Sequence, residues 1–370
     1  IASMNRIALL LVCVLAWLPA NSAAAEKPGE ASIVFVGDVM VAETPGELIA
    51  KGVDPFLPFQ PILRAHDIRI GNLECTVATG GKAEAKPYTF RADPAVLPLL
   101  ARHFDAMSLA NNHSGDFGKA AFAEQLGLMK KAGLPYFGGG HDATEAHAPL
   151  IVERNGLRIA LLGYLEFKPR SFEADAHRPG VAWSGEDDQV IEDIIAARTI
   201  HHADIVIPYM HWGWEEEAQP SPRLREFARR MIDAGADMVV GGHPHVTQGA
   251  ETYKGKPIIY SLGNFLFNGF ETEATTTGWV LSLRVGREGV REWRTHLHRP
   301  CGLYISPEQL VYIGQLGTAL PVNRDYPNLG ARVSIHALNG ELIAWLGADR
   351  PGLAPGQFLA PHGLAVDSHG

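Results

Sequence analysis

Hydrophobic and polar positions follow two periods along this chain, and the two periods predict strands and helices in turn. Short runs of buried-type residues predict strands, and apolar residues spaced three or four apart predict helices. The predicted strands lie at residues 32–36, 66–70, 105–109, 150–153, 158–162, 205–209 and 238–240. The predicted helices lie at residues 58–64, 94–103, 119–132, 186–200 and 223–234. Strands that alternate with helices indicate an α/β domain.

The clearest functional signal is the stretch 239–245, where a buried strand ends in two glycines and then in two histidines two positions apart. Glycines allow a tight turn, and the spacing can aim both imidazoles at one point. Two neutral imidazoles that converge suit zinc or a transition metal. A single His-x-His is nevertheless more often a pair of turn residues at the surface.

Other predicted strands end in the same kind of side chain. A lone Asp or Asn at a strand end is usually a turn residue. Here five strand ends carry ligand-type residues: Asp38, Glu74, Asn112 with His113, His211, and His243 with His245. Because the carboxyl ends of such strands meet at one edge of a sheet, we expect these side chains to share one cleft. The set predicts a site for one or two divalent metal ions of the Zn, Mn or Fe type.

Composition and charge narrow the class of partner. The chain has 370 residues, of which 46% are hydrophobic and 20% charged, which is ordinary for globular protein and long for one domain. The net charge of −9 comes without a basic cluster, so nucleic acid is not expected as a partner.

The first 25 residues are typical of a secretory signal peptide. A basic start at 4–6 precedes an apolar run at 7–18 and small residues at 22–25 that suit cleavage. The run is too short to span a membrane as a helix, and an uncleaved membrane anchor is the alternative. We therefore expect an exported, periplasmic or extracytoplasmic protein. Only two of the three cysteines would remain, so no disulfide framework is expected.

Six short motifs follow one another along the chain: Gly37-Asp38, Asn72-Leu73-Glu74, Ala110-Asn111-Asn112-His113 with Asp116, His211-Trp212-Gly213 with Glu215, Gly242-His243-Pro244-His245-Val246 with Gln248, and Tyr260-Ser261-Leu262-Gly263-Asn264-Phe265. Together they resemble the CapA family of capsule and poly-γ-glutamate synthesis proteins over about residues 31–299. The resemblance implies the calcineurin-like metallophosphatase fold, a four-layer αββα sandwich. It also implies action on an anionic cell-envelope polymer or its precursor, with a membrane synthesis complex as a further partner.

The resemblance divides the candidate ligands between two metals. Asp38 and His245 would hold the first metal, and Glu74 would stand where a carboxylate bridges the two. The second metal would have three ligands of its own: Asn112, His211 and His243.

Two positions depart from the phosphoesterase pattern. Met40 stands where a ligand histidine is expected, and a thioether is a poor ligand for hard or borderline ions. Glu74 replaces an aspartate and is one methylene longer. Asp38, Glu74 and His245 would still suffice for zinc-like coordination with an open position. A site with one metal, or a purely structural site, therefore stays open beside a two-metal phosphoesterase.

Three further residues are candidates for chemistry. The resemblance implies that His113 protonates the leaving group, and Asp116 is a candidate to orient it. Arg91 could clamp an anionic substrate, although it could equally be a solvated surface arginine. These residues indicate a metal-dependent hydrolase of the phosphoesterase type. The alternative is a non-catalytic polymer assembly or export factor that keeps the fold, and Met40 favours that alternative.

The last segment, residues 300–370, has a different pattern. The stretch 300–306 is echoed at 361–367, and runs at 332–335 and 341–347 predict a hairpin. These features resemble incomplete NHL-type β-propeller repeats, and a propeller needs about four blades. Because isolated repeats bury little surface, we expect this all-β segment to pack little against the rest of the chain.

Overall fold

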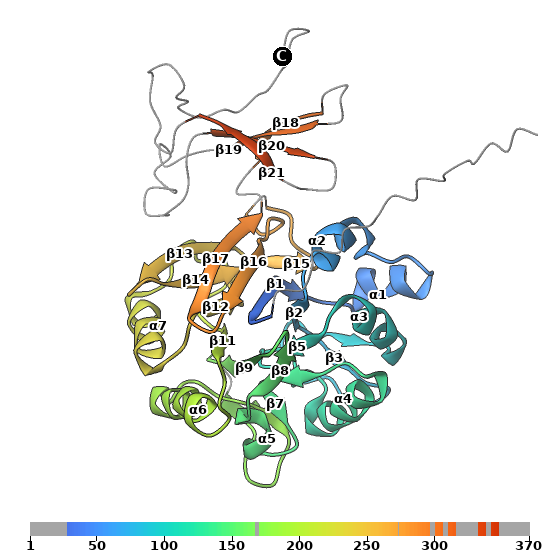
Figure 1. Cartoon of the computed structure of the whole chain (residues 1–370). Coiled ribbons are helices and arrows are strands. Elements are labelled where there is room, and N and C mark those ends of the chain that lie inside the picture. The colour runs from blue at the N-terminus through green and yellow to red at the C-terminus, as the bar shows by residue number, and fades with distance from the viewer. Residues whose placement is uncertain are drawn as a thin grey trace, which may run out of the picture.

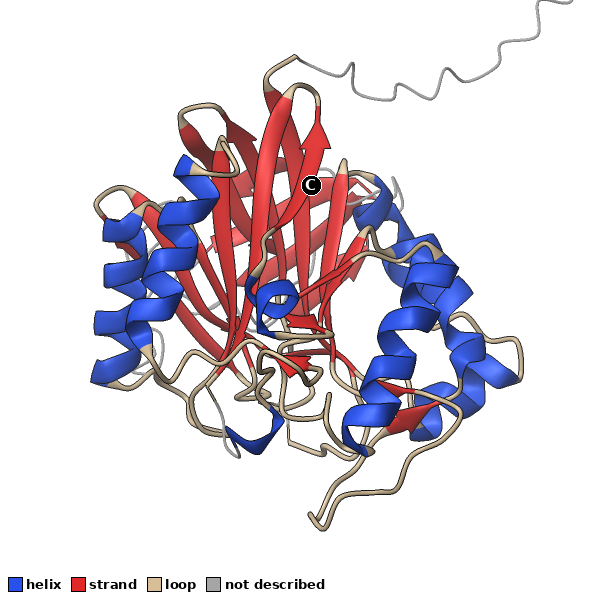
Figure 2. Cartoon of the chain, turned by 90° about the horizontal axis from the view of Figure 1, so that it is seen from below, coloured by secondary structure: helices blue, strands red, loops and turns tan. Residues whose placement is uncertain are grey.

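The computed structural model describes residues 28–166, 170–272, 274–296, 300–305, 310–315, 332–337 and 342–347. The predicted signal peptide and the second predicted propeller repeat lie outside these residues. Two large β-sheets form the inner layers, and helices lie on either side of them (Figures 1 and 2). No helix in the described ranges is long and apolar enough to cross a membrane.

The first sheet is built around a long N-terminal strand, with parallel strands on one side and an antiparallel pair on the other. The strand order is β17-β16-β1-β2-β5-β6, and β15 also pairs with β1 in parallel. The bounds are β1 (Glu30–Val39), β2 (Ile68–Leu73), β5 (Ala106–Ser108), β6 (Tyr136–Phe137), β15 (Asn264–Leu266), β16 (Val280–Gly286) and β17 (Gly289–His296).

The second sheet has four parallel strands flanked by one antiparallel strand at each edge. Its order is β13-β14-β12-β11-β9-β8. The bounds are β8 (Leu150–Arg154), β9 (Leu157–Leu165), β11 (Ile205–His211), β12 (Val239–Gly242), β13 (Thr247–Tyr253) and β14 (Lys256–Leu262). The predicted strands are thus present, and most run two or three residues further than the sequence pattern indicated.

Alternation along the strands builds three hydrophobic layers. In β1, Ile33 and Phe35 face the core between the two sheets, whereas Val34 and Val36 face the helices of the first sheet. Strand β11 of the second sheet alternates in the same way, and its Ile207 faces the core between the two sheets. Both faces of each sheet are therefore apolar, as buried parallel strands require. The four-layer αββα sandwich expected from the sequence is confirmed.

The helices complete the outer layers. Those packed on the first sheet are α1 (Glu43–Ala50), α2 (Gln60–Arg64), α3 (Leu97–His103) and α4 (Gly118–Ala132), and those on the second are α5 (Ala143–His147), α6 (Asp187–Thr199) and α7 (Pro222–Ala234). Three 3₁₀ turns accompany them, at Leu57–Phe59, Pro94–Val96 and Arg170–Phe172. Two-residue strand pairs connect the loops: β3 (Thr76–Val77) with β4 (Arg91–Ala92), and β7 (Gly139–Gly140) with β10 (Gly180–Val181).

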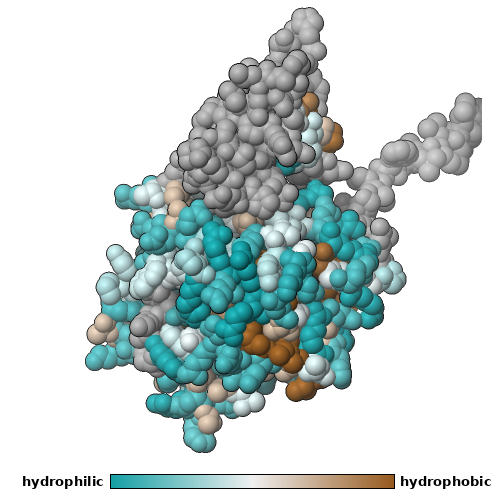
Figure 3. All heavy atoms as spheres, turned by 90° about the vertical axis from the view of Figure 1, so that its left-hand side faces the viewer, coloured by the Kyte–Doolittle hydropathy of each residue, from teal (hydrophilic) through white to brown (hydrophobic). Residues whose placement is uncertain are grey.

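Helix α7 shows how local sequence sets these elements. The Ser221 hydroxyl accepts a hydrogen bond from the Leu224 amide at 3.3 Å, Pro222 occupies the first turn, and Gly235 ends the helix with φ of 119°. One face is buried, and Phe227 is the largest side chain on it. The opposite face is polar, and the surface on this side of the molecule is largely hydrophilic (Figure 3).

The C-terminal segment forms a separate four-stranded antiparallel sheet in the order β18 (Pro300–Ile305), β19 (Leu310–Gln315), β20 (Arg332–Ala337) and β21 (Leu342–Leu346). The predicted hairpin is confirmed, since Val333 pairs with Leu346 across β20 and β21. Its strands pair only with one another among the described residues (Figure 1). Such a four-stranded antiparallel sheet is also the form of one propeller blade, and the NHL assignment stays a prediction.

Candidate metal centre

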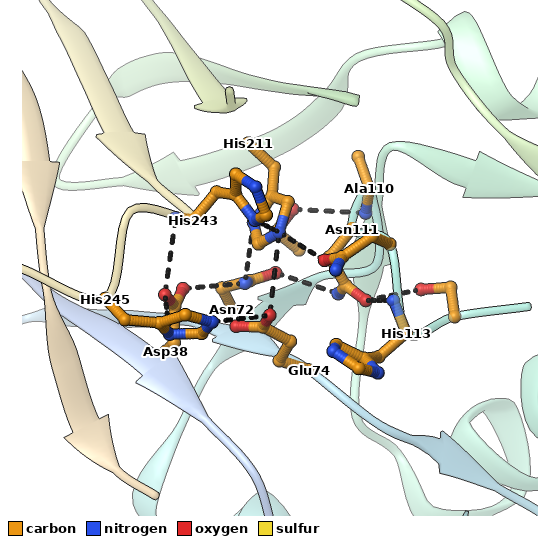
Figure 4. Close-up of polar contacts among 12 residues, drawn as sticks. Asp38, Asn72, Glu74, Ala110, Asn111, His113, His211, His243 and His245 are labelled. Atoms are coloured by element: carbon orange, nitrogen blue, oxygen red, sulfur yellow. Dashed lines mark hydrogen bonds and ion pairs between the residues drawn. The ribbon is translucent and has the colours of Figure 1, made fainter. Parts of the chain in front are cut away.

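The candidate ligands meet because parallel strands of both sheets end at the same place. Asp38 at the end of β1 is paired with Asn72 of β2 on one side and with Asn264 of β15 on the other. In the second sheet, His211 at the end of β11 is paired with Gly242 of β12, which leads directly into the two histidines of the loop. The sandwich thus delivers the ends of both sheets to one cluster (Figure 4).

Three of the other five predicted ligands lie close to His211. Its Nε2 atom lies 2.7 Å from Asn112 Oδ1, 3.1 Å from His243 Nδ1 and 3.6 Å from Glu74 Oε1. Donors bound to one zinc-sized ion at about 2.0–2.1 Å lie roughly 3–3.4 Å from one another. The spacing around His211 therefore fits a single divalent cation held by two imidazoles, an amide oxygen and a carboxylate.

The other two predicted ligands lie on the far side of Glu74. His245 Nε2 is 3.8 Å from Glu74 Oε1, and its Nδ1 is 3.6 Å from Asp38 Oδ2. Ligand atoms of Glu74, His243 and His245 lie within 4.8 Å of one another, as do those of Asp38, Glu74 and His211. Since Glu74 belongs to both groups, it occupies the position that a bridging carboxylate would need.

The two buried carboxylates of the cluster, Asp38 and Glu74, lack a Lys or Arg partner among the described residues. Glu74 is fully buried, and neither of its carboxylate oxygens accepts a hydrogen bond from any described residue. Burial first, and then the charge of Asp38, raise the pKa of Glu74 well above its ordinary value. Burial also raises the pKa of Asp38, although His245 and Asn72 oppose this. No Lys or Arg of the described ranges pairs with either carboxylate, so a bound cation would supply the missing charge.

The imidazoles are in the form that binds metals. Burial, followed by the neighbouring histidines, holds the pKa values of His211 and His243 well below the ordinary range. Both rings are therefore neutral at neutral pH. His245 donates from Nδ1 to Asn264 Oδ1 at 2.8 Å, which fixes its tautomer and leaves Nε2 for a metal. The donor set as a whole fits a divalent ion of the Zn, Mn or Fe class.

The loop that carries the two histidines is strained. His243 and His245 have φ angles of 94° and 57°, in the left-handed region that residues with side chains rarely adopt. The preceding glycines are required sterically, because a methyl group on Gly241 would lie 2.1 Å from the Tyr260 carbonyl oxygen. Strain of this kind concentrates at functional sites, where surrounding contacts hold the backbone in place.

The two predicted catalytic residues form a buried pair beside the cluster. His113 donates from Nδ1 to Asp116 Oδ2 at 2.8 Å. The same carboxylate accepts the Phe90 amide at 2.6 Å and forms an ion pair with Lys86, while the Phe90 ring packs on the imidazole with 4.5 Å between centroids. Burial lowers the pKa of His113, and its hydrogen bond to Asp116 opposes that shift. The hydrogen bond to Asp116 uses Nδ1 and leaves the Nε2 atom of His113 outside this pair.

Arg91 is placed differently from the expectation that it clamps substrate. Its side chain is exposed, donates to the carbonyl oxygens of Gly80 at 3.1 Å and Gly81 at 3.4 Å, and lies 4.6 Å above the Phe117 ring. Among the described residues, no interaction links it to the metal cluster. Its role in substrate binding stays a prediction.

Met40 lies in the hydrophobic core and provides no evident ligand. It is fully buried among the apolar residues between the first sheet and its helices. Its sulfur accepts the Ala42 amide at 3.2 Å. At position 40, where the phosphoesterase pattern has a ligand histidine, this chain therefore has a side chain that packs in the core.

Sequence reasoning missed several residues of the site. Asn72 is the most central, because its Nδ2 lies 2.9 Å from Asp38 Oδ1 and 3.3 Å from His211 Nδ1. Its position near the end of β2, two residues before Glu74, was a usable signal, since residues two apart in an extended chain face the same way. Asn264 and Lys86 gave no such signal, because the first could be read as a turn residue and the second lies in an irregular loop.

Aromatic side chains line the cluster on one side. Phe267 and Phe270 lie 4.9 Å and 4.7 Å from the ring of His245, measured between centroids. Phe90 connects this pair to His113, with its centroid 5.7 Å from that of Phe267. Apolar rings therefore form a continuous series of contacts from His245 to His113.

Comparisons with known proteins agree with the motifs. The sequence model of the family described as bacterial capsule synthesis protein PGA_cap matches residues 32–269. The chain is 35% identical over 243 residues to the PGA biosynthesis protein CapA of Bacillus subtilis (strain 168), covering 64% of this chain and 63% of that protein. It is 32% identical over 246 residues to the capsule biosynthesis protein CapA of Bacillus anthracis, covering 64% of this chain and 60% of that one.

The matched region is only part of each relative, since the chain spans about six tenths of their length. Among solved structures, the sulfate thiohydrolase SoxB of Thermus thermophilus in complex with glycerol is similar with a TM-score of 0.41 and 14% identity, over 72% of this chain and 56% of that chain. A likeness of that size carries no conclusion about activity.

Proposed function

The chain belongs to the family of bacterial capsule synthesis proteins, PGA_cap, and on that premise we propose that it is an exported metal-dependent hydrolase of cell-envelope polymer synthesis. Its relatives are named for the biosynthesis of capsule and of PGA. The proposed substrate is a capsular polymer such as poly-γ-glutamate, another anionic cell-envelope polymer, or a precursor of one. A membrane-bound synthesis complex is the proposed setting.

The observation that carries the hydrolase proposal is the burial of Glu74 between two groups of ligand atoms, beside the His113–Asp116 pair. Its two carboxylate oxygens are buried without a hydrogen-bond donor from the described residues. Neutral imidazoles surround them, and an orienting carboxylate holds a further histidine nearby. A site built only for stability would rarely leave a carboxylate in this state.

In the proposed hydrolysis, one set of residues binds the metal and another donates a proton. Asp38, Glu74, Asn112 and the histidines at 211, 243 and 245 would hold one or two divalent ions. Such an ion supplies Lewis-acid polarisation and a nucleophile at neutral pH. His113 is held by Asp116 with its Nε2 atom free of intramolecular hydrogen bonds to the described residues, and it would give a proton to the departing oxygen or nitrogen.

The proposal can be tested on the purified full chain. We expect it to contain Zn, Mn or Fe by elemental analysis, and to hydrolyse at least one phosphoester, amide or polymer substrate in a screen. A chelator should abolish that activity, and one of the three metals should restore it. Absence of bound metal after reconstitution with each ion would refute the metal site.

A non-catalytic assembly or export factor is the second candidate. The packing of Met40 into the core favours it. The first metal site, with Asp38, Glu74 and His245, then has one ligand fewer than in a two-metal phosphoesterase. This candidate predicts a protein that holds its metal and yet hydrolyses nothing across the screen. Polymer formation in cells would still depend on the protein.

A further inference from the structure

The hydroxyl of Tyr209 lies in the core at the base of the candidate metal cluster. Tyr209 is two residues before His211 on β11, so the two side chains leave the strand on the same face. It is fully buried between the two sheets, where its ring stacks on Phe35 with 6.3 Å between centroids. The hydroxyl therefore points along the core toward the strand ends that carry the ligands.

Gly242 shows how close this hydroxyl comes to a ligand. A methyl group on Gly242 would lie 2.9 Å from Asp38 Oδ1 and 3.2 Å from the Tyr209 hydroxyl oxygen. The two oxygens thus border the same small volume above the Gly242 α-carbon. A tyrosine hydroxyl is protonated at neutral pH, so this group can donate a hydrogen bond.

This hydroxyl differs from those of the other large buried tyrosines. Tyr164 donates to Asp193 at 2.9 Å, and Tyr260 donates to Glu251 at 3.0 Å. The Tyr209 hydroxyl is buried and makes no hydrogen bond to any described residue. Because buried hydroxyls nearly always have an acceptor, the exception at the edge of a metal cluster indicates a role there.

Asp38 is the acceptor that the geometry offers. Its Oδ1 already accepts from Asn72 at 2.9 Å, and its Oδ2 from the His243 amide at 3.3 Å. A carboxylate that binds a metal is oriented by outer hydrogen bonds of this kind, and loss of one typically weakens metal affinity. A third donor would complete the support of Asp38.

We infer that Tyr209 is a positioning residue of the metal centre, whose hydroxyl donates to Asp38 once a cation draws that carboxylate into place. The inference rests on the proposed metal site, and it adds an outer residue that the motifs do not contain. It also accounts for a glycine at position 242, since any side chain there would separate the two oxygens.

The test compares Tyr209→Phe with the wild-type full chain. Both proteins are stripped of metal, and the affinities for Zn²⁺ and Mn²⁺ are measured by competition with a chromophoric chelator. We expect Tyr209→Phe to raise Kd by about 10–100-fold. Thermal unfolding is then measured with and without metal. The metal-free variant should melt at the wild-type temperature or above it, because the ring stack stays while a hydroxyl without an acceptor is removed.

Tyr164→Phe is the matched control. Tyr164 is equally buried, on the neighbouring strand β9, but its hydroxyl bonds to Asp193 away from the cluster. This variant should melt at a lower temperature without metal, because Asp193 loses a donor, while its Kd for both ions stays at the wild-type value.

The outcomes separate the two proposals. Wild-type affinity in Tyr209→Phe, or an equal fall in melting temperature with and without metal, would make Tyr209 a core residue only and overturn the inference. A wild-type chain that binds neither ion would refute the metal site itself, and the inference with it. Weaker metal binding in Tyr209→Phe, with wild-type binding in Tyr164→Phe, supports both the metal site and the role of Tyr209.

Discussion

His113 and Asp116 are joined by a hydrogen bond of 2.8 Å from Nδ1 to Oδ2, and the carboxylate is fully buried. The bond sets the tautomer of the imidazole and leaves Nε2 directed away from the carboxylate. Neither residue is placed as a metal ligand. The pair can therefore be altered without removing any donor from the cluster, which separates acid catalysis from metal binding.

Replacing His113 should lower turnover and spare the metal. Loss of a general acid typically costs about 10²–10⁴-fold in rate. We expect His113→Ala to show that loss in the hydrolysis assay with unchanged metal content, and His243→Ala to lose metal and activity together. If His113→Ala also lost its metal, the residue would belong to the ligand set instead.

Glu74→Gln should make the melting temperature of the protein independent of added metal. The amide keeps the size of the carboxylate and removes a charge that lies against Asp38 without a cationic partner from the described residues. The metal-free variant should melt at the wild-type temperature or higher, by about 2–4 °C for each 1 kcal/mol gained. Added Zn²⁺ or Mn²⁺ should no longer raise its melting temperature. A metal-free variant that melts well below wild type would show that Glu74 is a structural residue.

Asn264→Ala should weaken metal binding although Asn264 is not itself a proposed ligand. Its Oδ1 accepts the Nδ1 hydrogen of His245, and without it the ring loses its fixed orientation. We expect a rise in Kd of about 10–100-fold, measured by chelator competition. Asn268→Ala is the control, since the amide of Asn268 reaches the Thr44 hydroxyl at 3.5 Å and no ligand. Equal affinities in the two variants would contradict the role given to Asn264.

Met40→Leu should leave the metal content unchanged. Met40 packs in an apolar core, and a swap of similar volume there usually costs less than about 1.5 kcal/mol. Elemental analysis should return the wild-type ratio of metal to protein, and chemical denaturation should show only that small loss. A fall in the metal ratio would mean that the thioether ligates after all.

The sequence pattern predicted alternating strands and helices and the gathering of polar strand ends because both follow from simple rules, whereas the four-layer sandwich came from the family resemblance. Parallel strands with apolar faces need helices on both sides, and their carboxyl ends meet. That reasoning predicted that His211 and Asp38 would share one cleft at the edge of a sheet, whereas the structure places them at the ends of two sheets that meet. It also predicted the β20–β21 hairpin from its turn residues.

Other features depend on contacts that leave no periodic trace. The guanidinium of Arg91 is occupied by the carbonyls of Gly80 and Gly81, and nothing in the sequence indicates that a loop would return to it. Lys86 reaches Asp116 from the same irregular loop. Helix α5 and the two-residue strand pairs are too short for a hydrophobic period to show.

Removal of the C-terminal sheet should have little effect on the sandwich. Strands β18 to β21 pair only among themselves within the described ranges, and a separate unit of this kind can be removed with little loss. A chain that stops after residue 299 should therefore keep the thermal unfolding temperature and the metal content of the full chain. A large drop in either would show that the two parts fold as one.

The pairing of Asp38 with Asn264 has a consequence for the order in which the protein matures. These residues come from near the start and the end of the sandwich, so strand β15 can add to β1 only after most of the sandwich has been synthesised. Contacts between such distant parts of a chain form slowly, because loop closure costs entropy before the contact is made. A chain still emerging from the ribosome would thus lack a complete site, and metal capture would mark the completion of folding.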